Sequence, residues 1–329
     1  MPRIETEITE LATALGALGY DLEAGLLELP PEIVNVSRST WDRLRSVHQA
    51  GQHRLLFTTA WANGRAFLLA KDGLRGRIPI RIEWKGPDRQ VEPDPIPADL
   101  RIDNVFLVSV KTRSAVLWNR SPSQVFTRTA NPAHWYAETA GDEYQALYEA
   151  AVVHSGLDGL PGRAVDLTRA QGQAMAASLG TRQWPKTLLP LYQTLAHRCS
   201  ARSAQIWNES VRSPSQREQT AWWLLRLAPA PYYLLGDATR APLRIRVNTP
   251  WDWRQTWHFE GLDIVPSAVA GQPQVEWALR ARHRETGETR HAEGYVEVRW
   301  SHGRFSGHPE AKVQLRTPHE RVPGYTPLT

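Results

Sequence analysis

The sequence predicts an α/β (α+β) protein in which an N-terminal α/β unit is followed by a helical region and then by a β-rich C-terminal region. Apolar residues recur with a helical period over 53–70, and apolar and polar residues alternate in short runs over 78–112. After Pro229 short alternating runs return, separated by turn residues. The predicted domains are an N-terminal α/β domain, a helical connector and a β-rich C-terminal domain, at 1–155, 156–230 and 231–329.

The N-terminal domain begins with helices. Residues 4–28 contain a short amphipathic helix that ends in a loop, and Ser39 or Thr40 can cap a helix from Trp41 to about His48. The longer periodic segment described above forms the next helix. The helices of this domain therefore precede its strands.

Three strands follow, and two of them form a hairpin. The strands cover 78–84, 99–102 and 105–112. Asp103 and Asn104 join the last two, and both residue types are typical of hairpin turns. The hairpin carries the most informative residues of the chain.

The remaining elements change from helices to strands along the chain. Asn131 can cap a helix that starts at Pro132 and runs to about His154. Four further helices are predicted, over 168–180, 185–198, 201–212 and 215–227. Five strands end the chain, over 231–236, 243–248, 274–283, 293–300 and 311–316.

Composition favours a foldable, basic protein without a membrane anchor. Of the 329 residues, 41% are hydrophobic and 22% are charged, and the net charge is +5, which suits a polyanionic partner. No apolar run of about 18 residues is present and the N-terminus carries early acids, so we expect neither a membrane span nor a signal peptide. Cys199 is the single cysteine, which excludes an intramolecular disulfide. We expect a cytoplasmic protein.

Motifs of several enzyme classes are missing from the sequence. There is no P-loop and no GxGxxG, which argues against nucleotide hydrolysis and dinucleotide binding. There is also no G-x-S-x-G, which argues against a serine hydrolase. The 11 histidines show no metal-ligand spacing.

An acid and a lysine occupy related places in the predicted hairpin. Asp99 begins the first strand, and Lys111 lies near the end of the second. The chain has only five lysines beside 34 arginines (39 − 5), so a lysine inside an apolar strand needs its own explanation. Enzymes that hydrolyse phosphodiesters use a carboxylate to hold a divalent cation and a positive group to position water. Asp99 and Lys111 are therefore candidate catalytic residues.

The hairpin resembles the motif of the PD-(D/E)XK superfamily, the restriction-endonuclease-like nucleases. In that motif an Asp is followed, after about ten residues, by acid-x-Lys. The matching residues are Pro97-Ala98-Asp99 and Ser109-Val110-Lys111-Thr112. The resemblance covers about residues 50–155. It implies a restriction-endonuclease-like core, in which a mixed sheet is flanked by helices. It also implies hydrolysis of DNA with Mg²⁺ or Mn²⁺, with Asp99 as a metal ligand and with restriction, repair or anti-phage defence as the setting.

One position departs from the family motif. Ser109 stands where the second acid is usual, although it can hold a metal-bound water, and Gln124 occupies the local position where a replacement acid is expected. Some members of the superfamily have Ser-x-Lys and take an acid from the following helix. The candidates for this acid are Glu138, Asp142 and Glu143 on the following helix and Glu83 on the preceding strand. The departure keeps a catalytically inactive nuclease fold open.

The length of the hairpin loop tests the catalytic interpretation. A two-residue loop would place Asp99 opposite Val108 and away from Lys111. A three-residue loop, 103–105, places Asp99 opposite Ser109 on the face of Lys111. The nuclease interpretation therefore predicts a loop of odd length or a bulge.

Simpler interpretations exist for the same residues. Asp99 can simply begin a strand, and Lys111 can protect a sheet edge from aggregation. The segment Glu83-Trp84-Lys85 also spells acid-x-Lys, although no suitable Asp precedes it.

Arginines and tryptophans offer a candidate surface for nucleic acid. Several of the 14 tryptophans stand next to arginines, and a basic hairpin turns at Gly287, although core packing and a solvated turn explain both patterns equally simply. The segment 191–212 has the pattern of a helix–turn–helix with a turn at Cys199-Ser200. The candidate nucleic-acid contacts are Arg113, Arg202, Arg254, Arg282 and Arg284.

We expect a metal-dependent endonuclease acting on DNA, with RNA as an open alternative substrate. Asp99, Glu138 and Glu143 are the expected metal ligands, and Lys111, Ser109 and Glu83 complete the candidate catalytic set. A partner protein of a defence or restriction system and a homodimer are open. The alternative is an inactive nuclease-fold subunit that binds nucleic acid or scaffolds a defence complex.

Overall fold

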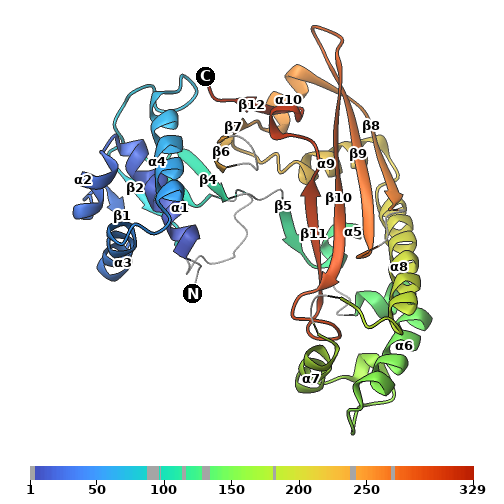
Figure 1. Cartoon of the computed structure of the whole chain (residues 1–329). Helices are drawn as coiled ribbons and strands as arrows, with labels where there is room; N and C mark the ends of the chain where they lie inside the picture. Colours follow the sequence, from blue (N-terminus) through green and yellow to red (C-terminus); the bar gives the residue numbers. More distant parts are fainter. Residues whose placement is uncertain are drawn as a thin grey trace.

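The computed structural model contains two β-sheets, each covered by its own helices (Figure 1). The structure describes residues 4–86, 96, 98–112, 116–127, 134–180, 183–237, 242–267 and 271–329. Within them, one sheet has seven strands of mixed direction and the other has five antiparallel strands. The predicted α/β class, with a mixed sheet and a β-rich region, is therefore confirmed.

The mixed sheet has the strand order β1-β2-β3-β4-β6-β7-β12. The pairs β1/β2 and β4/β6 are parallel, and the other neighbours are antiparallel. The strands are β1 (Ile33–Val34), β2 (Ile82–Trp84), β3 (Leu100–Ile102), β4 (Phe106–Thr112), β6 (Tyr232–Asp237), β7 (Pro242–Val247) and β12 (Tyr325–Pro327). Strand β4 thus lies in the middle of the sheet.

Helices from the N-terminal segment cover one face of the mixed sheet. They are α1 (Ile4–Leu18), α2 (Leu22–Leu27), α3 (Arg38–Gln49) and α4 (Arg54–Leu69). Helices α1 and α4 cross at Gly16 and Gly64, where an added Cβ atom would lie 2.0 Å from a backbone oxygen of the other helix. Their apolar side chains pack with Phe106, Val108 and Val110 of β4, which alternate along the strand and share this face.

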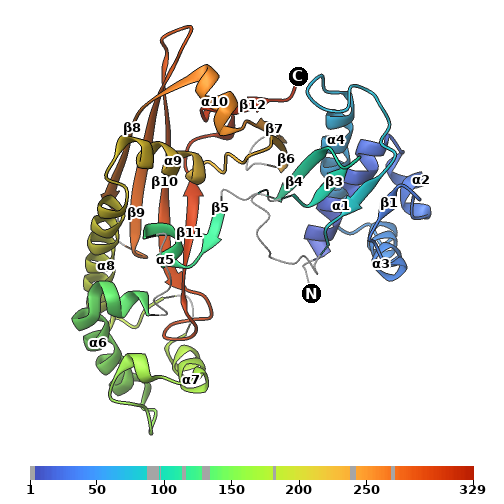
Figure 2. The same cartoon turned by 180° about the vertical axis from the view of Figure 1, so that it is seen from behind.

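The five-stranded sheet has the order β5-β11-β10-β9-β8. Its strands are β5 (Val116–Arg120), β8 (Trp257–Pro266), β9 (Gln274–His283), β10 (Thr289–Trp300) and β11 (Pro309–Leu315). The other helices are α5 (Pro122–Phe126), α6 (Trp135–Ser155), α7 (Arg169–Leu179), α8 (Leu189–Ser210), α9 (Pro214–Leu224) and α10 (Pro250–Thr256), with 3-10 turns η1 (Ala164–Asp166) and η2 (His319–Arg321). Figure 2 shows α8 lying along β8 and β9.

Each of the two sheets combines strands from both the predicted N-terminal and the predicted C-terminal domain. Strands β6, β7 and β12 come from the predicted C-terminal domain but pair in the mixed sheet with the N-terminal strands. Strand β5 comes from the predicted N-terminal domain but pairs with β11 in the other sheet. The alternation of apolar and polar residues along a strand indicates which face is buried. It does not indicate which other strand pairs with it, so the sequence held no local signal for these long-range pairings.

The predicted helix–turn–helix is wrong, because α8 is one continuous helix across Cys199 and Ser200. Both residues are buried, and the Ser200 hydroxyl donates to the Ala196 carbonyl at 2.8 Å. A serine that bonds back to the preceding turn fits inside a helix, so no break is required. The predicted cap Asn131 lies outside the described residues.

Strands β8 and β5 were also not predicted, each for a local reason. Strand β8 has a register shift between Phe259 and Gly261, which breaks its inside–outside alternation. Strand β5 is a short edge strand that ends in the exposed polar residues Asn119 and Arg120.

Candidate functional site

Strands β3 and β4 form the predicted hairpin with a three-residue loop. Leu100 pairs with Val108 and Ile102 pairs with Phe106, which leaves residues 103–105 as the loop. The odd loop length that the catalytic interpretation requires is therefore confirmed. Asp103, with a φ of 49°, adopts the left-handed conformation that Asp tolerates better than most residues.

The Asp103 side chain fixes this loop to the preceding segment. Its carboxylate accepts hydrogen bonds from the backbone N–H groups of Ile80, at 2.8 Å, and Arg81, at 3.0 Å, and pairs with Arg77 at 2.6 Å. Burial by itself would raise the pKa of Asp103, but these hydrogen bonds and the Arg77 charge lower it below its ordinary value. The loop is therefore held by charge-assisted bonds to the segment that precedes β2.

The Asp99 carboxylate sits across the hairpin against β4. Its Oδ2 accepts a hydrogen bond from the Val110 backbone N–H at 2.6 Å and another from the Ser109 hydroxyl at 3.2 Å. The Ser109 side chain is fully buried, whereas Asp99 is half-buried. The carboxylate is thus oriented by two donors and keeps partial access to solvent.

Lys111 lies on the same side of β4 as Ser109. The two residues are two positions apart in a regular strand, and the residues between and before them, Val110 and Val108, point to the helices on the other face. Because Asp99 bonds to Ser109, the structure places the acid and the lysine on one side of the sheet. Lys111 is half-buried.

The pairing of β4 bears on one of the simpler interpretations, in which Lys111 protects a sheet edge. Strand β6 pairs with Lys111 itself, whereas β3 pairs with β4 only over Phe106–Val108. Lys111 therefore lies on a strand that is paired on its β6 side along its whole end.

The mixed sheet brings further polar residues to the same end, and sequence analysis did not connect Asp237 or His319 with this site. Lys85 follows β2 and its backbone N–H donates to the Asp99 carbonyl at 3.0 Å, while Asp237 ends β6 opposite Thr112. His319 of η2 also lies near, since the Lys111 charge contributes to its pKa shift. About 125 and 200 residues separate Asp237 and His319 from the hairpin, so only the folded topology reveals them.

Desolvation is the main cause of the lowered pKa of His319, and Lys111 lowers it further by like-charge repulsion. The neighbouring Glu320 acts in the opposite direction. The result is that His319 favours its neutral form, so the positive charge at this end of the sheet rests mainly on lysine.

Glu83 lies in β2 but is engaged by other groups. Its carboxylate forms an ion pair with Arg101 on β3 and accepts a hydrogen bond from Asn35 at 3.2 Å. Arg101 pairs with Leu107, which lies closer to the loop than Ser109 does. Arg101 and Asp99 are two positions apart and share one face of the sheet, so Glu83 lies on the Asp99 side, where Arg101 and Asn35 engage its carboxylate.

The structure does not bring Glu138 and Glu143 to the hairpin, so the predicted recruitment of an acid from the following helix is corrected. Both residues lie on α6, which packs against α7 and α8 at the far end of the molecule from β3 and β4 in both views (Figures 1 and 2). Glu138 is exposed, and Glu143 faces Arg198 at 3.8 Å. The helix follows β4 in sequence, but β5 joins the other sheet first and carries the chain away.

The predicted arginines are partly neutralised in the structure. Arg202 lies 4.0 Å from Glu209, Arg254 lies 2.7 Å from Glu218, and Arg282 lies 3.1 Å from Glu260. Arg284 donates to the Arg254 carbonyl at 2.7 Å, so these two residues are brought together at the α10 end of β8 and β9. Arg202 lies apart on α8, and Arg113 lies outside the described residues.

On the Lys111 side of the sheet, the described residues offer the carboxylates of Asp99 and Glu83, and Glu83 is already paired with Arg101. Among them, no group of three or more His, Cys, Asp or Glu side chains could hold a metal ion. Asp237 belongs to the row of Tyr233 and Leu235, which packs against the helices on the opposite face. Mg²⁺ keeps several waters and is often bound by one or two carboxylates together with substrate phosphates, a set in which Asp99 can take part.

Comparisons with known proteins give no information on this site. No family model matches the chain, and neither a curated protein nor a solved structure gives a significant match. In the part of the chain that the structure describes, no helix has the length and apolar character needed to cross a bilayer.

Proposed function

We propose that this protein is a nuclease that hydrolyses DNA phosphodiester bonds at the Asp99–Lys111 hairpin, with Mg²⁺ or Mn²⁺ as its cofactor. The observation that carries the proposal is the register of β3 and β4, which sets the Asp99 carboxylate against Ser109 on the side of Lys111. The mixed sheet around the hairpin and the sequence resemblance to PD-(D/E)XK nucleases support it. Restriction or anti-phage defence is the setting that this resemblance suggests.

The chemistry assigns separate roles to the two residues. In phosphodiester hydrolysis a water oxygen bonds to phosphorus, the ester P–O bond breaks and the leaving oxygen takes up a proton. The Lys111 ammonium would orient the attacking water and offset the negative charge that grows on the phosphoryl oxygens. Asp99 would be the carboxylate ligand of the divalent ion, which supplies Lewis-acid activation when bound. The hydrogen bonds from Val110 and Ser109 would hold this carboxylate in place.

A second candidate function is a nuclease-fold subunit that binds nucleic acid or scaffolds a defence complex without cutting. It is favoured by the buried serine at position 109 and by the placement of Glu138 and Glu143 far from Asp99. On this alternative, Lys111 and the basic surface hold phosphates and no bond is broken.

A cleavage assay with single variants tests the proposal. The purified protein is incubated with plasmid DNA, with labelled single- and double-stranded DNA and with RNA, in Mg²⁺, Mn²⁺ or EDTA. We expect metal-dependent cleavage of DNA that falls by about 100-fold or more in Asp99→Ala and in Lys111→Ala. Removing the metal with EDTA should abolish it.

Matched variants separate the site from general effects of charge. Lys71 and Asp158 are exposed residues outside β3 and β4, so Lys71→Ala and Asp158→Ala should cut like the wild type. Glu138→Ala and Glu143→Ala should also keep their activity, because α6 lies far from Asp99. Cleavage that survives in both Asp99→Ala and Lys111→Ala removes this catalytic assignment. Salt-sensitive DNA binding without cleavage in any metal favours the second candidate.

A further inference from the structure

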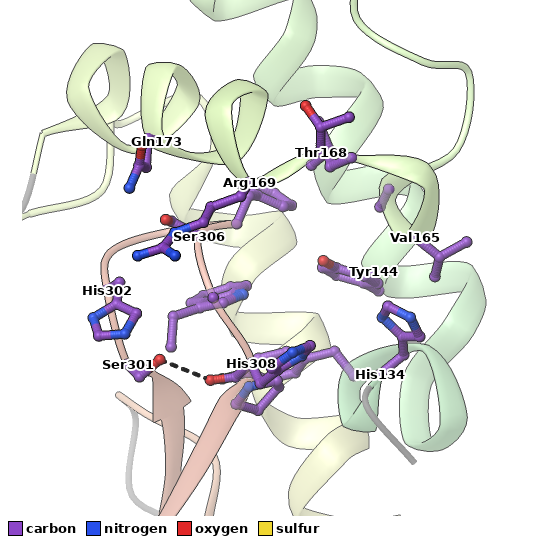
Figure 3. Close-up of a pocket in the computed structure, with 17 residues that line it drawn as sticks. His134, Tyr144, Val165, Thr168, Arg169, Gln173, Ser301, His302, Ser306 and His308 are labelled. Atoms are coloured by element: carbon purple, nitrogen blue, oxygen red, sulfur yellow. Dashed lines mark hydrogen bonds between the residues drawn. The ribbon is translucent and has the colours of Figure 1, made fainter.

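A pocket lies between α6, α7 and the connection from β10 to β11, apart from the hairpin (Figure 3). Its volume of about 390 Å³ falls in the range of small-molecule sites. Neither Asp99 nor Lys111 lines it. The pocket is therefore a separate place at which the chain can bind a ligand.

Aromatic rings form the floor of this pocket. Tyr136 and Trp300 have ring centroids 4.5 Å apart, and Tyr144 stacks on Phe305 with an interplanar angle of 20°. Burial raises the pKa of Tyr144 to about 12, so its phenol stays protonated and can donate a hydrogen bond. Phe305 has a φ of 60°, a rare conformation for a bulky residue, and it presents its ring to this floor. Such a surface suits a flat aromatic ligand.

The polar lining is basic and contains no acid. Arg169 and three histidines line the pocket, and none of its 17 lining residues is Asp or Glu. Arg169 forms no ion pair within the described part of the chain. The ring N–H groups of these histidines can donate hydrogen bonds to an anion. The pocket therefore favours a ligand that carries negative charge.

Ser306 provides an independent sign of a missing partner. Its side chain is 2% exposed and lines the pocket, yet its hydroxyl makes no hydrogen bond with any described residue. A ligand in the pocket that carries an acceptor atom would give this hydroxyl a hydrogen-bond partner. Figure 3 shows Ser306, the Arg169 guanidinium and His302 at one end of the pocket, with His134 at the other.

Helix α7 adds to the positive character of the Arg169 end. It is 11 residues long and starts at Arg169, behind a capping box in which Thr168 and Gln171 exchange hydrogen bonds. The positive end of its dipole therefore lies at the pocket wall, where it favours an anion.

We propose that this pocket binds a nucleoside monophosphate, either as the free nucleotide or as the phosphorylated end of a nucleic-acid strand. The base stacks on the floor of Tyr144 and Trp300, and the phosphate accepts hydrogen bonds from Arg169 and Ser306. The pocket is a binding site distinct from the proposed nuclease centre, so either proposal can fail without the other.

Calorimetric titration of the full chain tests the proposal. The probes are the four common nucleoside 5′-monophosphates, their nucleosides, inorganic phosphate, and 12-mer strands with a 5′-phosphate, a 3′-phosphate or neither. We expect at least one probe that carries a nucleoside monophosphate, free or at a strand end, to bind at least tenfold more tightly than the matching nucleoside. It should also bind at least tenfold more tightly than inorganic phosphate. Arg169→Ala should weaken this binding at least tenfold and Ser306→Ala several-fold, while Arg198→Ala on α8, an exposed arginine away from the pocket, should change nothing.

The outcomes decide both the ligand and its source. Equal binding of free nucleotide and phosphorylated strand supports the free nucleotide, and tighter binding of a phosphorylated strand supports a strand end. Three results overturn the proposal: no binding of any probe at 1 mM, phosphate binding as tightly as nucleotide, or binding that Arg169→Ala and Ser306→Ala leave intact. Repeating the titration with Lys111→Ala, which should bind normally, keeps this test separate from that of the nuclease.

Discussion

Gly236 lies so close to Lys111 that a Cβ atom added to it would stand 1.9 Å from the Lys111 carbonyl oxygen. The two residues are register partners in the parallel pair β4/β6. Strand β6 therefore approaches the backbone of the catalytic candidate at a residue without a side chain, where a larger residue would not fit.

Gly236→Ala should push β6 away from β4 and displace Lys111. We expect destabilisation of roughly 1–3 kcal/mol, because the added methyl meets backbone rather than a flexible side chain. DNA cleavage should fall by more than the loss of folded protein explains. Urea unfolding and the cleavage assay on the same preparations measure the two effects.

The control for this variant is Gly162→Ala. Gly162 has open space around it, so its alanine variant should be as stable and as active as the wild type. A Gly236→Ala protein that unfolds and cuts like the wild type would mean that β6 does not pack against β4 in this register.

Asn63 ties α4 to the mixed sheet and should be important for stability. Its side chain is 1% exposed, donates to the Gly236 carbonyl at 2.7 Å and accepts from the Arg244 guanidinium at 2.9 Å. Asn63→Leu leaves both partners without their bonds, and we expect a loss of about 2–4 kcal/mol in urea unfolding. The control is Asn248→Ala, which removes the hydrogen bond that the less buried Asn248 accepts from Arg246. This variant should lose less than about 1.5 kcal/mol of unfolding free energy. Equal losses would contradict the buried network.

The hairpin could be predicted because its signals are local. Alternation fixed the faces of β4, and the choice between a two-residue and a three-residue loop at Asp103 followed from the requirement that Asp99 meet Ser109. Strand β9, with regular alternation over ten residues, was predicted with its observed limits, Gln274–His283.

The rest of the site could not be predicted because its signals are tertiary. The nearest helix in sequence offered Glu138 and Glu143, but β5 pairs with β11 and carries that helix to the other sheet. Lys85, Asp237 and His319 reach the hairpin only through strand order and the C-terminal turn. The pocket of Arg169 and Ser306 combines segments about 135 residues apart, without a motif in either.

The pH dependence of stability should carry a contribution from His319. Its pKa is lowered in the folded protein, so below the ordinary histidine pKa of about 6.5 the unfolded chain binds more protons than the folded one. This contribution is present above that pH and is lost as the pH falls toward the folded-state pKa. Urea unfolding at pH 7.5 and pH 5.5 should show a smaller pH-dependent loss in His319→Gln than in the wild type.

The same histidine reports on the position of Lys111. Removing the lysine charge in Lys111→Gln should raise the pKa of His319, because like-charge repulsion is then absent. NMR titration of the imidazole, assigned with His319→Gln, measures it. Lys71→Gln, which removes an exposed charge elsewhere, should leave the titration unchanged. An unchanged midpoint in Lys111→Gln would place the lysine away from η2.

Cys199 should be unreactive until the protein unfolds. Its thiol is fully buried on α8, and burial raises its pKa to about 11, with the Thr139 hydroxyl at 3.3 Å acting in the opposite direction. The two-unit rise from its ordinary value of 9.0 lowers the thiolate fraction at pH 8 by about 100-fold, before steric protection is counted. A disulfide reagent at pH 8 should therefore label the native chain at least 100-fold more slowly than the chain in guanidinium, where one equivalent reacts. Cys199→Ser, the control, should not be labelled in either state, and rapid labelling of the native protein would contradict the packing of α8 against α6.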